Sequence, residues 1–68
     1  MNASTRTAYA AVIAEADAKA AEYTKQRATL VRGSRTYDRD YAYLTHLIES
    51  QRTKADRHRA IAEAKEQG

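Results

Sequence analysis

Large side chains recur at intervals of three and four residues through the first half of the chain. This spacing places them on one face of a helix, which we expect to span about residues 5–31. The residues that define the face are Tyr9, Val12, Ile13, Ala16, Ala20 and Tyr23. A hydroxyl before or within the first turn can cap a helix by accepting from a free backbone N–H, and the candidates here are Ser4, Thr5 and Thr7.

The second half repeats the pattern and predicts another helix, over about residues 37–65. Its face is formed by Tyr37, Tyr41, Leu44, Ile48, Gln51, Ala55, His58 and Ala62, and Leu47 and Ile61 widen it. Thr36 is a candidate N-cap, and Asp38 and Asp40 suit the positive end of a helix dipole. Because the face becomes weakly apolar after Ile48, we expect the rest of this helix to lean on another chain.

The segment between the two helices allows two interpretations. In the first, Gly33 ends the first helix in a left-handed conformation and the chain forms an αα-hairpin. In the second, residues 29–37 form a short β-hairpin with Gly33-Ser34 as its turn, since Thr29, Val31 and Thr36 are β-branched. Both interpretations give Gly33 a positive φ.

The composition limits how large a core the chain can build. It has 68 residues, of which fifteen are alanine and five are tyrosine, and a chain this short buries only about 60% of its unfolded surface. The sequence therefore predicts a mainly α fold, a single helical-hairpin domain over 1–68 without a separate linker. The predicted seam, in the core or between copies, consists of Tyr9, Ile13, Tyr23, Tyr41, Leu44 and Ile48. With no cysteine to form a disulfide, we expect the chain to be oligomeric.

Positive charge is concentrated around the bend. The net charge is +3, and between residues 25 and 39 five basic residues stand against Asp38 alone. A basic bend suits an acidic partner or a nucleic acid, and its structural alternative is a solvated loop. The candidate partner-binding residues are Arg32, Arg35, Tyr37 and Arg39.

Catalytic, metal and membrane functions have little support in the sequence. His46, Glu49 and Ser50 lie three and four residues apart and can approach one another on a helix, but no residue pattern supplies an oxyanion hole or a pocket. The stretch around Gly33 lacks the spacing of a phosphate-binding loop, and no run of residues is apolar enough to span a membrane. We therefore expect no enzyme activity, no metal, no cofactor, no small-molecule substrate and no membrane association.

The stretch "GSRTYDRDYAYLTHLIE", residues 33–49, resembles small head–tail joining proteins of tailed phages, the lambda-type head-completion family. In that family an alanine-rich helix is followed by a short hairpin, a Gly-Ser-Arg-like turn and a second helix with Leu and Ile at helical spacing. The resemblance is carried by Arg35, Tyr37, Arg39, Leu44 and Ile48.

The resemblance implies a non-enzymatic virion protein that forms a ring of many copies below the portal, retains packaged DNA and docks the next connector or tail protein. Two alternatives follow from the residues themselves. One is a small regulatory or inhibitory module that acts on a host factor as a helical dimer, which would place it in the host cytoplasm. The other is a helical hairpin that binds nucleic acid through its basic bend.

Overall fold

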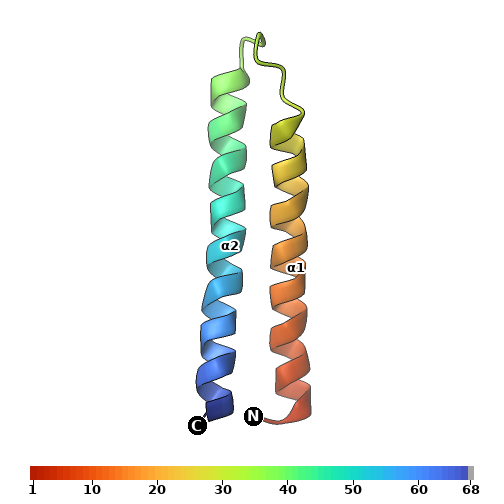
Figure 1. Ribbon diagram of the computed structural model, residues 1–68, viewed down its shortest axis with the longest axis vertical. Helices are drawn as coiled ribbons and strands as arrows, with labels where there is room; N and C mark the ends of the chain where they lie inside the picture. The colour runs from red at the N-terminus through yellow and green to blue at the C-terminus, as the bar shows by residue number, and fades with distance from the viewer. Residues whose placement is uncertain (68) are drawn as a thin grey trace.

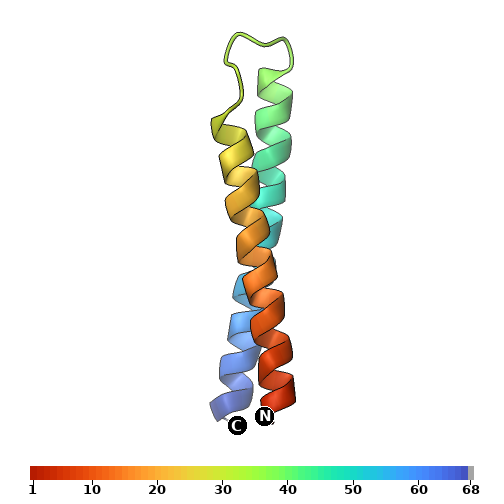
Figure 2. The same ribbon diagram turned by 90° about the vertical axis from the view of Figure 1, so that its right-hand side faces the viewer.

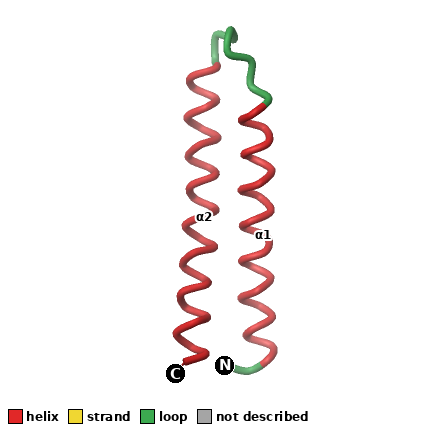
Figure 3. The backbone as a smooth tube through the Cα atoms, in the orientation of Figure 1, coloured by secondary structure: helices red, strands yellow, loops and turns green. Residues whose placement is uncertain are grey.

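The computed structural model describes residues 1–67 and consists of two antiparallel helices, α1 (Ala3–Ala28) and α2 (Tyr37–Gln67). The loop of residues 29–36 joins them at one end of the molecule, and both termini lie at the other end (Figure 1). The αα-hairpin interpretation is confirmed. The β-hairpin interpretation is wrong, because residues 29–37 form no strand (Figure 3).

The helices pack along a seam that repeats every seven residues in both. In α1 the seam runs through Tyr9, Ile13, Ala16, Ala20, Tyr23 and Arg27, and in α2 through Tyr37, Tyr41, Leu44, Ile48, Gln51, Ala55, His58 and Ala62. Apolar positions at alternating steps of three and four residues produce the seam of a coiled coil. Helices packed along such a seam cross at a shallow angle, and Figure 2 shows this crossing.

The buried core is narrow. It contains Ala16, Ala20, Leu44, Ile48 and Ala55, and Ile48 is the largest fully buried side chain at 1% exposure. Of the other predicted seam residues, Tyr9, Ile13 and Tyr23 are half-buried and Tyr41 is 41% exposed. The Cα trace measures 52 × 15 × 10 Å, with a radius of gyration of 15.7 Å against about 11 Å for a compact chain of this length. The molecule is a thin rod.

The second half of α2 packs against α1 of its own chain. The Tyr9 and His58 rings lie 6.0 Å apart, the guanidinium of Arg59 donates to the Asp17 carboxylate, and Arg6 pairs with Glu66 at 2.7 Å. The weakly apolar half of α2 faces the start of α1 because the two helices are antiparallel and similar in length. The short side chains Ala16 and Ala55 are buried between them.

α1 begins at Ala3, two residues earlier than expected, and α2 begins at Tyr37 as expected, but the caps of both helices differ from the prediction. Asn2 caps α1, since its side chain accepts from the Thr5 N–H at 2.8 Å, so the predicted caps Ser4, Thr5 and Thr7 lie inside the helix. Before α2, the Thr36 carbonyl accepts from the Asp40 N–H at 2.8 Å. The Thr36 hydroxyl donates to the Asp40 carboxylate at 2.8 Å rather than accepting from a backbone N–H.

The loop turns without a left-handed residue. The Thr29 hydroxyl and N–H both donate to the Gln26 carbonyl, at 2.8 and 3.1 Å, and this shared bond ends α1 at Ala28 instead of residue 31. The Ser34 N–H then donates to the Val31 carbonyl at 3.0 Å, which closes a turn with Gly33 in its third position. Gly33 does not have positive φ, so the expectation of a left-handed glycine is wrong. A type I turn needs only negative φ values.

Candidate functional site

The loop end of the rod holds the whole net charge of the chain. Residues 25–40 contain five basic side chains and two acidic ones, Asp38 and Asp40, so their net charge is +3. The rest of the chain has seven basic and seven acidic side chains, so its net charge is zero. Four of the five basic side chains are exposed. We call this group the basic tip: Lys25, Arg32, Arg35 and Arg39.

The loop geometry presents two of these arginines with no ionic partner. Arg32 and Arg35 occupy successive turns, the second closed by the Tyr37 N–H donating to the Ser34 carbonyl at 3.2 Å. Neither arginine forms an ion pair with any part of residues 1–67. Arg39 lies 3.5 Å from the adjacent Asp40 carboxylate, with 78% of its side chain exposed, so this contact restrains it only weakly.

An apolar side chain accompanies the arginines. Val31 precedes Arg32 in the loop and is 70% exposed, the most exposed large hydrophobic residue among residues 1–67. A single exposed valine is ordinary for a protein surface. Here, however, Val31 lies next to unpaired arginines. Together they form a small exposed surface that can make both apolar and charged contacts with a partner.

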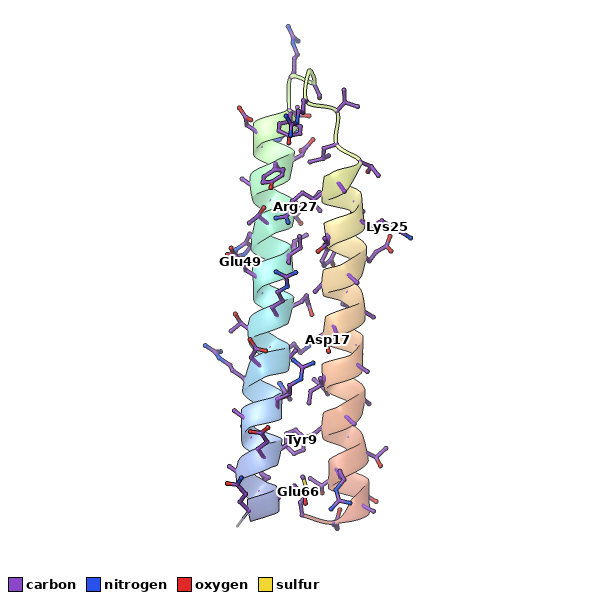
Figure 4. All side chains as sticks on the ribbon, in the orientation of Figure 1. Tyr9, Asp17, Lys25, Arg27, Glu49 and Glu66 are labelled. Carbon is purple, nitrogen blue, oxygen red and sulfur yellow. The ribbon has the colours of Figure 1, made fainter. Side chains whose placement is uncertain are left out.

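The fifth basic residue of this region, Arg27, is turned inward. Its guanidinium lies 4.9 Å from the centre of the Tyr41 ring and donates to the Thr45 hydroxyl at 2.8 Å. Figure 4 shows Arg27 between the helices and Lys25 pointing away from them. The sequence contained the signal for this difference, because Arg27 lies four residues after Tyr23 and seven after Ala20, on the seam.

The tyrosines near the tip serve the helix interface. The rings of Tyr37 and Tyr41 lie 5.7 Å apart, Tyr37 is half-buried, and Arg27 covers the Tyr41 ring. The structure therefore places Arg32, Arg35 and Arg39 on the outer surface of the tip and Tyr37 beneath it. The predicted partner-binding set is divided into an exposed basic part and a packed aromatic part.

The residues considered for catalysis lie on the outer surface of α2. His46, Glu49 and Ser50 line one open groove together with Lys54 and Arg57. Within residues 1–67 no hydrogen bond joins His46 to Glu49 or Ser50, and His58 instead contacts the Lys54 carbonyl through Nδ1 at 2.7 Å. No cluster of three or more His, Cys, Asp or Glu in the described part of the chain has a metal-binding arrangement. The groove thus shows no nucleophile aligned with a base.

Two exposed ion pairs away from the tip shift the pKa of their carboxyl groups. Arg6 donates two hydrogen bonds to Glu66, at 2.7 and 3.2 Å, and these bonds lower the pKa of the Glu66 carboxyl. Likewise, Lys19 lies 3.1 Å from Glu15 and lowers the pKa of that carboxyl by hydrogen bonding and charge, with a smaller contribution from Lys54. Glu66 lies between the helices near the termini, while Glu49 points outward (Figure 4).

Comparison with known proteins leaves the function to be argued from this geometry. Neither a protein-family model, nor a curated protein, nor a solved structure matches the chain. Within residues 1–67, neither helix is long and apolar enough to cross a membrane.

Proposed function

We propose that the protein is a non-enzymatic assembly subunit that docks through its basic tip onto an acidic surface of a protein partner. The observation behind this proposal is the pair Arg32 and Arg35, which are exposed at the end of a two-helix rod and form no ion pair among residues 1–67. Arginine forms forked hydrogen bonds with carboxylates and is enriched in protein interfaces. Helices on both sides fix the ends of the loop and reduce the entropy lost on docking.

A protein partner fits the tip better than single-stranded nucleic acid. Sequence-tolerant binding of single strands depends on aromatic side chains on which the bases stack. Tyr37 and Tyr41, the tyrosines beside the tip, are already engaged, because Tyr37 packs on Tyr41 and Arg27 covers the Tyr41 ring; the exposed Tyr43 lies farther along α2, outside the tip. The tip offers arginines and Val31, which is 70% exposed, a combination of charge and apolar contact that suits a folded protein surface.

The resemblance over residues 33–49 gives the proposal its specific form, a head–tail connector subunit in the virion of a tailed phage. Leu44 and Ile48, two residues of that likeness, are buried in the seam, and Arg35 and Arg39 are exposed at the tip. In this role the tip would contact the portal or the neighbouring connector protein. The chain departs from the family pattern before Gly33, where the short β-hairpin of that family is replaced by turns.

The test combines a charge reversal at the tip with a matched reversal elsewhere. The variant Arg32→Glu/Arg35→Glu should keep its helical circular dichroism, because both side chains are exposed in the loop, and should bind its partner at least roughly tenfold more weakly. The control, Arg52→Glu/Arg57→Glu, makes the same charge change at exposed positions of α2 and should bind normally.

For the phage form of the proposal, the assay is mass spectrometry of purified particles after complementation with each variant. The wild type and the control should be incorporated, and the tip variant should be missing or strongly reduced. Absence of the wild-type protein from particles would refute the connector role. Salt-sensitive binding of a DNA duplex or single strand that the tip variant abolishes would instead assign the tip to nucleic acid.

A further inference from the structure

The two broad faces of the rod differ in character. One face carries the interhelical ion pairs, Arg6 with Glu66 and Asp17 with Arg59, and we call these four residues the paired face. Successive helical residues are about 100° apart, so positions two residues apart point to nearly opposite sides. Lys19 and Ile61, each two residues beyond a member of the paired face, therefore lie on the opposite broad face.

The opposite face carries the apolar side chains that the hairpin does not bury. On α2 it contains Tyr43, Leu47 and Ile61, because steps of four, seven and fourteen residues return to the same side of a helix. On α1 it contains Val12, seven residues before Lys19. Tyr43 is 62% exposed and Ile61 is 44% exposed, while Val12 and Leu47 are half-buried. We call these four residues the open face.

We propose that the open face binds a second copy of this chain, with the two rods antiparallel, to form a four-helix bundle. This inference concerns a surface separate from the basic tip and does not depend on the proposed function. It rests on the size of the face, on the distribution of its apolar residues along the rod, and on the charge at one end of the rod.

The size of the face matches what a stable dimer requires. The two larger dimensions of the Cα trace, 52 and 15 Å, give the whole broad face, charged band included, a projected area of about 780 Å², comparable with the ~800 Å² of accessible surface that each partner buries in a standard interface. Within residues 1–67 of a single chain, only five hydrophobic residues are buried. A chain without disulfides gains its remaining burial most directly from association.

The apolar residues form two groups, one on each side of a charged band. Tyr43 and Leu47 lie toward the loop, and Ile61 and Val12 lie toward the termini, where Arg6 pairs with Glu66 and Asp17 with Arg59. Between the groups lie Glu15, Lys19 and Lys54, and the Glu15 carboxyl pairs with Lys19 at 3.1 Å. Leu47 and Ile61 are each seven residues from Lys54, so a two-fold axis near Lys54 places each group against the other group of the second copy.

The charge of the tip selects the antiparallel arrangement. In a parallel dimer the two tips, each with a net +3 over residues 25–40, would lie side by side and repel one another. In the antiparallel dimer they lie at opposite ends of a rod 52 Å long, well beyond the screening length of about 8 Å at physiological salt. In the central band Lys19 is paired with Glu15 at 3.1 Å, which limits the charge that two copies bring together there.

Sedimentation equilibrium of the full chain provides the first test. At roughly 100 µM, far above the micromolar Kd of a weak interface, the wild type should have twice the mass of one chain. Tyr43→Glu and Ile61→Glu should each raise the dimer Kd at least tenfold. Their neighbours supply matched controls, because Ala42→Glu and Ala60→Glu introduce the same charge at exposed positions on the outer side of α2 and should leave the Kd unchanged.

Cysteine cross-linking tests the orientation, and the absence of native cysteine makes each introduced thiol unique. A mixture of Leu47→Cys and Ile61→Cys chains, which an axis near Lys54 places opposite one another, should form a disulfide-linked dimer on mild oxidation, whereas neither variant alone should do so. A monomeric wild type, a mass other than two chains, or open-face variants that still dimerise like their controls would overturn the proposal. Self-linking of either single variant would overturn the antiparallel arrangement.

Discussion

Ile48→Ala should destabilise the hairpin far more than Ile61→Ala, although both changes remove the same atoms from the same helix. Ile48 is 1% exposed and Ile61 is 44% exposed. Truncation of a buried isoleucine to alanine costs about 2–5 kcal/mol, through lost transfer free energy and the cavity left behind. The gain in helix propensity on replacing isoleucine by alanine is below about 0.7 kcal/mol. Because both variants share that gain, the difference between them isolates burial, and we expect that difference to be about 2–4 kcal/mol.

The assay is urea unfolding followed by far-UV circular dichroism, at a protein concentration low enough that association of copies does not add to the free energy. A domain of this length has a total stability of roughly 3–10 kcal/mol, so Ile48→Ala risks leaving too little folded protein to measure. Ile48→Val then supplies a graded change, expected to cost about 0.5–1.5 kcal/mol. Equal losses for Ile48→Ala and Ile61→Ala under these conditions would refute the packing described for the seam.

Three further predictions concern the ends and the turn. Gly33→Ala should leave the free energy of unfolding unchanged or raise it by about 0.4–1 kcal/mol, as measured by urea unfolding, because alanine restricts the unfolded chain. The native turn tolerates the change, since Gly33 lacks positive φ and an added Cβ meets nothing within 4 Å. A clear loss of stability would contradict this. Asn2→Ala should cost about 0.5–2 kcal/mol by removing the cap bond to the Thr5 N–H, whereas Asn2→Asp should not. In Arg6→Gln, an NMR titration should find the lowered pKa of Glu66 returning toward its ordinary value. Because that pKa is lowered on folding, the pair stabilises the fold above the unfolded pKa and its contribution fades as pH falls through the folded pKa, so the wild type and Arg6→Gln should converge in stability in acid.

The spacing of residues along the chain was sufficient to predict both helices and most of their interface. Leu44 and Ile48 are in the core as expected, because steps of three and four residues determine which side chains share a face regardless of what covers them. The number of helices and their antiparallel order follow from the same pattern and one short connection. The spacing does not determine which partner covers each face.

Three features of the structure go beyond what the spacing predicts, each for its own physical reason. The second half of α2 was expected to depend on another chain, yet within one chain Ala55 is already buried and His58 lies beside Tyr9, because α1 is antiparallel and runs alongside the length of α2. Gly33 seemed to need a left-handed conformation, yet the bonds from Thr29 to the Gln26 carbonyl end α1 several residues earlier. Arg27 was grouped with the basic residues of the bend, whereas its position on the seam directs it onto Tyr41.

The two proposals, a partner at the basic tip and an antiparallel pair through the open face, have a joint consequence. An antiparallel pair of rods holds two tips at opposite ends, about one rod length apart, so a single compact acidic patch can engage only one of them. The pair is therefore suited to bridging two partner surfaces, and the second contact gains from the effective concentration set by the rigid spacing. A dimer whose tips lay together would instead act as one larger cationic patch on one partner. The orientation of the pair thus determines whether the protein links its partners or covers one of them.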